Sequence, residues 1–316
     1  MPSSLVRFLA GQAFGRYRLL EEVARGGMGV VLKAEDPLRP GHVAIKTLPP
    51  ELAHDPELVR RLEEEAGAQA KVQHPNIVGL IERGTDPQPH LVMEFVEGTT
   101  LRERITAEGP LKTNDGLRVA QQVVSALRAI HATATVHCDL NPANIMLRHD
   151  ERATVQLLDF GIARTVGDPF AVREGVVLGT LGYMSPEHQA SLSTKVTCAS
   201  DVYSLAPIVF EIFSGQPLFA GETANAIARE RPTVPKRVSE LSAMPEELRR
   251  LLTAMLLVPP TDRPSMDSIA QTIDQLLDRL PPNSGGTPPP RAQPPPDVLT
   301  LPITRTFARY HRHAAA

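Results

Sequence analysis

The most informative segment of this chain reads His137-Cys138-Asp139-Leu140-Asn141-Pro142-Ala143-Asn144, and Asp159-Phe160-Gly161 follows twenty residues after Asp139. A helical pattern at residues 117–131 precedes the segment, and short strand-like runs follow near Ile145 and at residues 156–158. An aspartate and an asparagine five residues apart in a loop can be plain turn residues, because both side chains bond to nearby backbone. The rest of the chain must decide between a turn and a chemical site.

Upstream, a glycine cluster predicts a hairpin. It reads Ala24-Arg25-Gly26-Gly27-Met28-Gly29-Val30-Val31, and strand-like runs lie on both sides of it, at residues 17–23 and 30–32. Glycines between two such runs favour a hairpin. They also let backbone N–H groups come close to a phosphate. Taken alone, the cluster is explained equally well by a plain turn.

A third predicted strand, Val43-Ala44-Ile45-Lys46, ends on a lysine, which by itself is typical of a surface end. The next helix is predicted to start at Asp55-Pro56, an N-cap followed by proline at the first helical position. One face of this helix starts apolar and then points a carboxylate the same way. That face carries Leu58, Leu62, Glu65 and Gln69. Glu63 and Glu64 are rivals for the inward carboxylate, and the stripe favours Glu65.

Further elements follow from periodicity. Strands are predicted at residues 77–81 and 91–96, and helices at residues 201–214, 246–257 and 265–280. Residues 281–299 contain eight prolines, so this segment is predicted to be an extended linker, and a short basic tail follows at residues 305–310.

Six blocks of this sequence occur in the order and rough spacing of the eukaryotic-like (Hanks-type) serine/threonine protein kinases of bacteria. The blocks are residues 24–31, 43–46, 91–98, 137–144 (followed by 159–161), 179–187, and 201–205 with 260–264. The chain resembles that family from Tyr17 to about Leu280. The resemblance implies an α+β, bilobed protein-kinase fold with the nucleotide held between the lobes. The small N-lobe, an antiparallel sheet with one main helix, is expected at residues 15–97, and the larger, mainly helical C-lobe at residues 98–280. Residues 1–14 are then a leader, and residues 281–316 a disordered linker and tail.

The resemblance also implies roles for the polar residues. Asp139 would accept the proton of the substrate hydroxyl, and Asn144 and Asp159 would hold Mg²⁺, with Mn²⁺ as an alternative. Lys46, held by Glu65, would be aimed at the phosphates of ATP, and Thr180 would lie close to the catalytic aspartate. The expected nucleotide-binding residues are Val23, Gly26, Gly27, Gly29, Val31, Ala44, Lys46, Glu65, Met93, Glu94, Val96 and Met146.

Residues 179–187 resemble the end of the family's activation segment, with Ser185 in place of the usual alanine. By the same resemblance, Arg263 is expected to pair with Glu187. Both residues are expected to be structural rather than catalytic.

Three departures from the family pattern affect the expected activity: Ala24 replaces a glycine, Cys138 an arginine and Asn141 a lysine. Because that arginine binds a phosphate on the activation segment, and residues 166–179 contain no serine, threonine or tyrosine, we expect no phosphorylation switch there. Replacing a charged donor by the neutral Asn141 costs about 1–2 kcal/mol, or roughly a five- to thirtyfold lower rate. A slow kinase is expected. A pseudokinase that binds nucleotide as a scaffold is the alternative, and a small-molecule kinase is a third reading.

The composition of the chain limits the kinds of partner and the cellular compartment that we expect. The chain has 316 residues, 42% of them hydrophobic, and a net charge of -3, which does not indicate a nucleic-acid binder. Its two cysteines form no disulfide framework, and there is neither a long apolar run nor a signal-peptide pattern, so a cytoplasmic protein without a membrane segment is expected. The expected partners are protein substrates and ATP, and a regulatory partner could bind the proline-rich tail. Thr300, Thr304 and Thr306 are either phosphorylation or docking sites or part of a disordered end.

Overall fold

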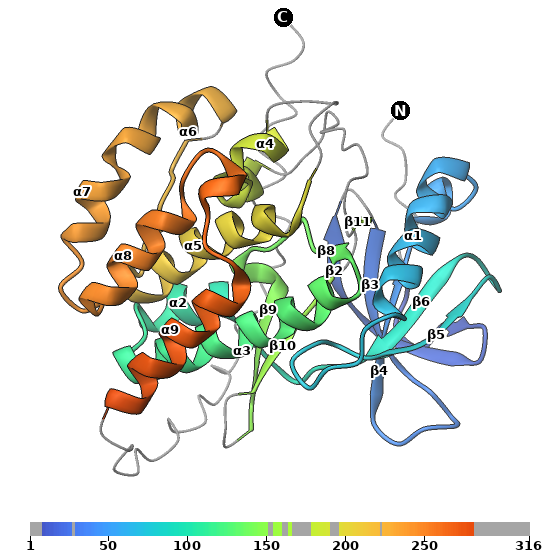
Figure 1. Ribbon diagram of the computed structural model, residues 1–316. Coiled ribbons are helices and arrows are strands. Elements are labelled where there is room, and N and C mark those ends of the chain that lie inside the picture. The colour runs from blue at the N-terminus through green and yellow to red at the C-terminus, as the bar shows by residue number, and fades with distance from the viewer. Residues whose placement is uncertain are drawn as a thin grey trace, which may run out of the picture. The chain divides into compact units, whose positions relative to one another are not determined.

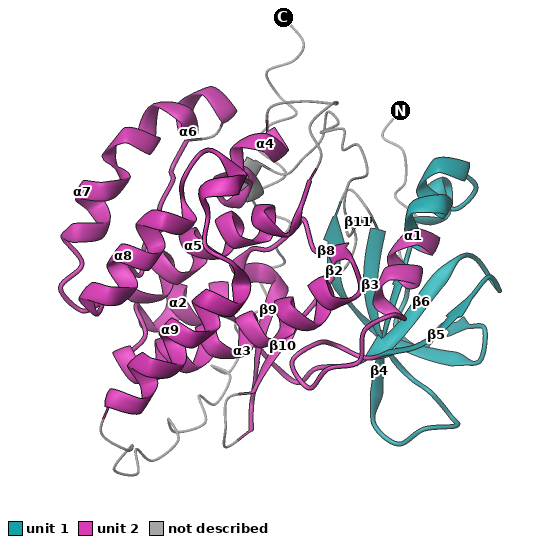
Figure 2. Cartoon of the chain, in the orientation of Figure 1, with its two compact units in different colours: residues 1–62, 80–95, 282–316 teal, residues 63–79, 96–281 magenta. Residues whose placement is uncertain are grey.

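The computed structural model describes residues 8–26, 29–150, 154–159, 164–165, 178–189, 196–221 and 223–280. The chain divides into two compact units (Figure 2). Among the described residues, those within 8–62 and 80–95 belong to the first unit, and those within 63–79 and 96–280 belong to the second. The expected linker and tail at residues 281–316 lie outside the described residues, as do residues 1–7 of the expected leader.

The first unit is built on one antiparallel sheet of six strands in the order β1-β2-β3-β4-β6-β5 (Figure 1). The strands are β1 (Ala13–Phe14), β2 (Tyr17–Gly26), β3 (Gly29–Glu35), β4 (His42–Thr47), β5 (Leu80–Gly84) and β6 (His90–Glu94). Side chains alternate between the two faces of a strand, so the register assigns each residue to a face. One face carries the core of this unit: Phe14, Tyr17, Leu19, Val30, Leu32, Ala34, Val43, Ile45 and Val92.

Helix α1 (Pro56–Gln69) begins as the sequence predicts. The Asp55 carboxylate accepts hydrogen bonds from the backbone N–H groups of Glu57 (2.9 Å) and Leu58 (3.2 Å), which is N-cap geometry. The helix starts in the first unit and ends in the second.

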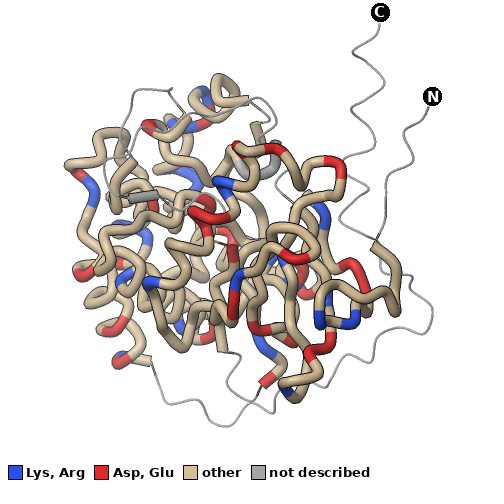
Figure 3. Tube along the Cα trace, turned by 90° about the vertical axis from the view of Figure 1, so that its right-hand side faces the viewer, with Lys and Arg blue, Asp and Glu red and all other residues tan. Residues whose placement is uncertain are grey.

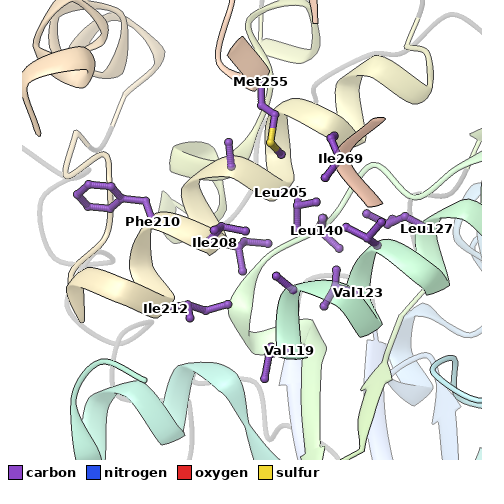
Figure 4. Close-up of a cluster of buried hydrophobic side chains, with 14 of the residues drawn as sticks. Val119, Val123, Leu127, Leu140, Leu205, Ile208, Phe210, Ile212, Met255 and Ile269 are labelled. Atoms are coloured by element: carbon purple, nitrogen blue, oxygen red, sulfur yellow. The ribbon is translucent and has the colours of Figure 1, made fainter. Parts of the chain in front are cut away.

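The second unit is mainly helical. Its longer helices are α2 (Leu101–Glu108), α3 (Thr113–Ala132), α5 (Cys198–Ser214), α8 (Glu246–Met255) and α9 (Met266–Arg279), and its short ones are α4 (Pro186–Gln189), α6 (Ala224–Glu230) and α7 (Val234–Ser239). Apolar side chains from α3, α5, α8 and α9 meet in its core (Figure 4). Every residue of α5 from Ser200 to Phe213 is buried, as expected of a helix that is apolar on nearly all sides. The bilobed α+β expectation is therefore confirmed.

Two small sheets support the loops of the second unit. Strands β7 (Gly98–Thr100), β9 (Ile145–Arg148) and β10 (Val155–Leu157) pair in the order β10-β9-β7, and β8 (Thr135–Val136) pairs with β11 (Arg164–Thr165). The 3-10 turns η2 (Pro142–Asn144) and η3 (Leu178–Tyr183) interrupt the connections. No helix among the described residues is long and apolar enough to cross a bilayer.

The prediction of a strand at residues 77–81 was wrong for its first half. Asn76 and Val78 make backbone hydrogen bonds with Leu157 of β10 (2.8 and 3.1 Å), and Gln69 donates from its amide to the Val78 carbonyl (3.0 Å). These bonds hold the segment in the second unit, and the strand starts only at Leu80. Local apolar periodicity does not report such long-range pairing. Helices α2, α4, α6 and α7 were not predicted.

Candidate active site

Asp201 of α5 holds the loop that contains Asp139. The Asp201 side chain is fully buried. The Asp201 carboxylate accepts hydrogen bonds from the backbone N–H groups of His137 (Oδ2, 2.9 Å) and Cys138 (Oδ1, 3.0 Å). It also bonds to Nε2 of His131 on α3 at 2.8 Å. These bonds stabilise an unusual backbone, because Cys138 has φ of 66°, which is uncommon for a residue with a side chain. One carboxylate thus fixes the start of the loop.

His137 ties this loop to the segment that carries Asp159. Its Nδ1 accepts the backbone N–H of Asp139 (3.3 Å), and its Nε2 donates to the Leu158 carbonyl (3.2 Å). A ring that accepts at one nitrogen and donates at the other is neutral. In agreement, complete burial lowers the pKa of His137.

Two side-chain amides donate hydrogen bonds to the Asp139 carboxylate. Asn141 donates from Nδ2 to Asp139 Oδ1 (3.3 Å), and Asn144 donates from Nδ2 to Oδ2 (3.1 Å). Both amides also donate to the backbone carbonyl of Asp139, at 3.1 and 2.9 Å. The Asn141 carbonyl oxygen accepts the Ala143 N–H at 3.0 Å and so caps η2. Asn141 is therefore engaged within its own loop.

Asn144 and Asp159 provide an oxygen set that fits a magnesium ion. Because Asn144 uses its amide nitrogen on Asp139, its Oδ1 is the atom left to face a cation. The backbone N–H of Leu158 donates to the Asn144 carbonyl (2.8 Å), which brings the next residue, Asp159, beside Asn144. The described residues contain no group of three or more His, Cys, Asp or Glu that could hold a metal. One carboxylate and one amide suit Mg²⁺, which keeps waters and binds substrate phosphates.

In the first unit, the register gathers four of the expected nucleotide-binding residues on one face of the sheet. Val31 pairs with Lys46, and Ala44 pairs with Met93, so these four side chains point to the face opposite the core. Lys46 is 5% exposed. A buried ammonium group requires hydrogen-bond or ionic partners, so this lysine is not the surface end that a lone strand lysine suggests.

The two described glycines of the hairpin differ in whether a side chain would fit at their positions. Gly29 has φ of 147°, and a Cβ there would lie 2.6 Å from the Thr47 carbonyl oxygen, so no side chain fits. Gly26 has ordinary backbone angles, and a Cβ would meet nothing within 4 Å. Packing therefore demands glycine at position 29 but not at position 26. Gly27 lies outside the described residues, and Val23 is 46% exposed.

Comparison with protein-family models matches residues 17–273 to the protein kinase domain. The chain belongs to the protein kinase family. PrkC of Bacillus subtilis (strain 168), a serine/threonine-protein kinase, is 38% identical over 241 residues, covering 72% of this chain and 36% of PrkC. The serine/threonine-protein kinase PknB of Mycobacterium tuberculosis (strain ATCC 25177 / H37Ra) is 36% identical over 253 residues, covering 77% of this chain and 39% of PknB. The chain thus spans well under half the length of these relatives.

Solved structures give the same family. The kinase domain of Mycobacterium tuberculosis PknI superposes with a TM-score of 0.62 at 26% identity, covering 85% of this chain and 99% of that domain. A double mutant of the same domain gives a TM-score of 0.64 at 25% identity and covers 86% of this chain and all of that domain. The resemblance to bacterial Hanks-type kinases is confirmed.

The structure shows how far several of the other predicted site residues are buried. Glu65 is 4% exposed, whereas Glu63 and Glu64 are exposed, so burial selects Glu65 as the inward carboxylate of α1. Val96 is buried, and Met146 on β9 is half-buried. Glu94 is the last residue of β6 in the first unit and is exposed. Thr180 lies in η3, but its side chain is outside the described residues, as are Phe160 and Gly161.

The expected pairing of Glu187 with Arg263 is confirmed. The guanidinium binds the carboxylate with two nitrogens, at 2.7 and 2.8 Å, and Ser200 donates to the same carboxylate at 2.8 Å. Arg263 also donates to backbone carbonyls of Ala199, Leu257 and Val258. Burial alone would raise the pKa of Glu187, but these bonds outweigh it and hold that pKa below its usual range.

Sequence reasoning missed the roles of His131, His137 and Asp201 in holding the loop. It treated Asp201 only as part of a structural helix. A signal was available, because an acidic residue inside the apolar run of α5 must find partners when it is buried. The identity of those partners, which are 63 to 70 residues away in the chain, was not readable from the sequence.

Proposed function

We propose that this chain is a serine/threonine protein kinase that transfers the γ-phosphate of ATP to hydroxyl groups of proteins. The observation that carries the proposal is the Asp139 carboxylate, held on one oxygen by Asn141 and on the other by Asn144 in a loop anchored to Asp201. A fixed carboxylate in this position is suited to accept the proton of an incoming hydroxyl group.

The other residues then have complementary roles. Lys46 neutralises charge on the ATP phosphates, and Val31, Ala44 and Met93 cover the base. Asn144 and Asp159 would hold Mg²⁺, with Mn²⁺ as an alternative, and a bound ion would offset the negative charge that develops during transfer. Backbone groups at Glu94 and Val96 bind the edge of the adenine ring. Thr180 lies near Asp139, the residue that accepts the proton of the substrate hydroxyl. These assignments follow the kinase family pattern.

The enzyme is proposed to be slow. The lysine that serine/threonine kinases carry two residues after the aspartate is Asn141 here, and its amide donates to Asp139 rather than to a phosphate. Loss of that cation predicts roughly a five- to thirtyfold lower rate. An Asn141→Lys variant should therefore transfer phosphate faster than the natural chain, with the change in kcat.

We also propose that the activation segment, whose residues 166–179 contain no serine, threonine or tyrosine, is not switched on by phosphorylation. The position of the phosphate-binding arginine is held by Cys138, which is 3% exposed and packs against Val136 and Val196. A small apolar-packed thiol cannot pair with a phosphate. Phosphosite mapping on the purified protein tests this idea, and a stoichiometric phosphate on Thr165 that raised activity would overturn it.

The deciding experiment is incubation with labelled ATP, Mg²⁺ and a generic protein substrate. The natural chain should label the substrate above the level of the Asp159→Asn and Asp139→Asn variants. Lys46→Met should also lower the labelling. Lys236→Met, a change of an exposed lysine in α7, is its matched control and should retain activity. Incorporation equal to that of Asp159→Asn, with nucleotide binding retained, would favour the pseudokinase alternative.

The cysteines and the proline-rich segment bear on where the chain is found and on what regulates it. We place the chain in the cytoplasm because both of its cysteines are thiols, which suits a reducing compartment. A regulatory partner is proposed to bind the proline-rich segment at residues 281–299, because extended proline-rich segments are a common docking form. Cell fractionation and a binding comparison with and without residues 281–316 test these two points.

A further inference from the structure

The only two cysteines of the sequence, Cys138 and Cys198, belong to one apolar cluster although sixty residues separate them. Val136, Cys138 and Val196 form the buried part of the cluster, and the half-buried Cys198 packs against it. Both cysteines are thiols in this structure. Neither thiol has a part in the proposed phosphate transfer, so the pair is available for other chemistry.

The hydrogen bonds of Asp201 bring the two cysteines to the same place. Cys198 is the first residue of α5 and Asp201 is three positions later, so their side chains lie on one face of the helix. The backbone N–H of Cys138 donates to Asp201 Oδ1 at 3.0 Å. One carboxylate therefore ties Cys138 to the face of α5 that carries Cys198. A disulfide needs two Cα atoms within about 4.4–6.8 Å, and this arrangement favours such closeness.

A cation also lies beside this pair. Burial by itself lowers the pKa of His131, but hydrogen bonds with Asp201 and Cys198 outweigh burial and raise the pKa to about 10. The imidazole is therefore protonated at neutral pH. His131 bonds to Cys198 and to Asp201 at once, so it holds the Cys198 side chain near the carboxylate that also binds the backbone of Cys138.

We propose that Cys138 and Cys198 are a site of reversible oxidation and form a disulfide when the chain meets a peroxide. The sulfur of the more exposed Cys198 attacks one oxygen of hydrogen peroxide, the O–O bond breaks, and a sulfenic acid and water result. The sulfur of Cys138 then displaces the sulfenic hydroxyl as water, and the S–S bond forms. Two thiols and one peroxide thus give one disulfide and two waters.

The disulfide has a consequence for activity, and this part rests on the proposed kinase function. Cys138 directly precedes Asp139, and its sulfur now lies 3.7 Å from the Val136 carbonyl oxygen. Bonding to Cys198 draws this side chain towards α5 and shifts a backbone that already has a positive φ. A displacement of the next residue by about 1 Å is expected to lower phosphate transfer on the order of 10- to 100-fold.

Peptide mapping tests the chemistry independently of any activity. The reduced full-length chain is treated with hydrogen peroxide, alkylated and digested with trypsin without reduction. The Cys138 peptide (residues 129–148) and the Cys198 peptide (residues 196–229) each contain a single cysteine. They should appear as one linked species, two hydrogen masses lighter than their sum, that separates on addition of dithiothreitol. The Cys198→Ala variant should give no linked species.

Two outcomes would overturn the proposal. In one, Cys138 stays fully alkylatable after oxidation, while Cys198 carries only sulfenic or sulfinic acid. In the other, the peptides are linked only between chains, which a non-reducing gel shows as a dimer. In the activity arm, peroxide should inhibit the natural chain reversibly and leave Cys198→Ala unaffected. If the natural chain has no activity even when reduced, the kinase proposal fails, but the linked peptide still decides the disulfide.

Discussion

At the scale of single residues, burial separates the charges that matter from those that do not. Arg263 and Glu187 form a bidentate pair with side chains 0% and 7% exposed, whereas Lys236 and Glu240 are 3.9 Å apart with side chains 81% and 63% exposed. Figure 3 shows basic and acidic residues interspersed along the chain, and many of them form exposed pairs of the second kind. Water screens such exposed pairs, so they contribute little.

Removing one half of the buried pair should be costly. Glu187→Ala leaves the Arg263 guanidinium buried without its carboxylate and is expected to lower the free energy of unfolding by about 3–5 kcal/mol. Glu240→Ala is the matched control and should change it by less than about 0.5 kcal/mol. Urea unfolding followed by circular dichroism measures both. Equal effects of the two changes would contradict the assignment.

The pair of His131 and Asp201 predicts a pH dependence. The pKa of His131 is raised from its ordinary 6.5 to about 10 in the folded chain, so its contribution to stability is fully present below pH 6.5 and is lost as the pH rises through about 10. Burial opposes ionisation of Asp201, but its bonds with His131 outweigh burial and hold its pKa below the ordinary 3.8. Asp201 therefore stays ionised throughout this pH window.

The stability difference between the natural chain and His131→Gln should therefore shrink as the pH rises from about 6.5 to 10. Urea unfolding at several pH values measures this difference. His149→Gln, a change of an exposed histidine that bonds to Thr99, should show no such trend. A difference that stays constant across the window would show that His131 is not held in its charged form.

At the scale of elements, two features position the chemistry. Helix α5 is buried along nearly its whole length and presents Asp201 to the loop that contains Asp139. The β2–β3 hairpin continues its ladder to the pair Gly26 and Gly29, where the backbone of Gly29 lies against Thr47 of β4. At Gly29 the described part of the hairpin therefore requires a close approach of two backbones.

Substitution at the two glycines should separate these effects. Gly29→Ala forces a side chain against the Thr47 carbonyl and into a strained φ, and is expected to weaken the hairpin by about 1–3 kcal/mol. Gly26→Ala meets no atom within 4 Å and should change it by less than about 0.5 kcal/mol. Hydrogen exchange of peptides covering residues 17–35 reports the difference, as exchange at least about tenfold faster in Gly29→Ala only. Similar exchange in both variants would refute the close approach.

At the scale of the whole molecule, each unit has its own apolar core and its own part of the proposed machinery. The first unit carries Lys46 on the sheet face opposite its core, and the second carries Asp139, Asn144 and Asp159. A ligand that binds only the folded chain stabilises it by mass action.

ATP with Mg²⁺ at about one hundred times its dissociation constant should add about 2.7 kcal/mol to the free energy of unfolding, which raises the Tm by several degrees. Thermal unfolding by circular dichroism measures this shift. Lys46→Met should reduce the shift, and Lys236→Met should retain it. In Asp159→Asn the shift should no longer depend on magnesium. A full shift in Lys46→Met would mean that this lysine does not bind the nucleotide.

Much of the fold and of the candidate site was readable from the sequence, because the relevant signals are local. Alternating apolar residues located β2, β3 and β4, and Asp55-Pro56 located the start of α1. Ordered motifs singled out Asp139, Asn144 and Asp159. These conclusions needed only neighbours in the chain and the resemblance to a known family.

The tertiary structure alone decided which distant groups meet. Burial agreed with the choice of Glu65 that the apolar stripe favours, whereas only the structure showed that Asp201 anchors a loop more than sixty residues away in the chain. Asn141 proved to bind Asp139, and Cys138 proved to share a cluster with Cys198. The reason is physical: periodicity records which face of an element is apolar, whereas the partner of a buried polar group depends on the path of the chain through space.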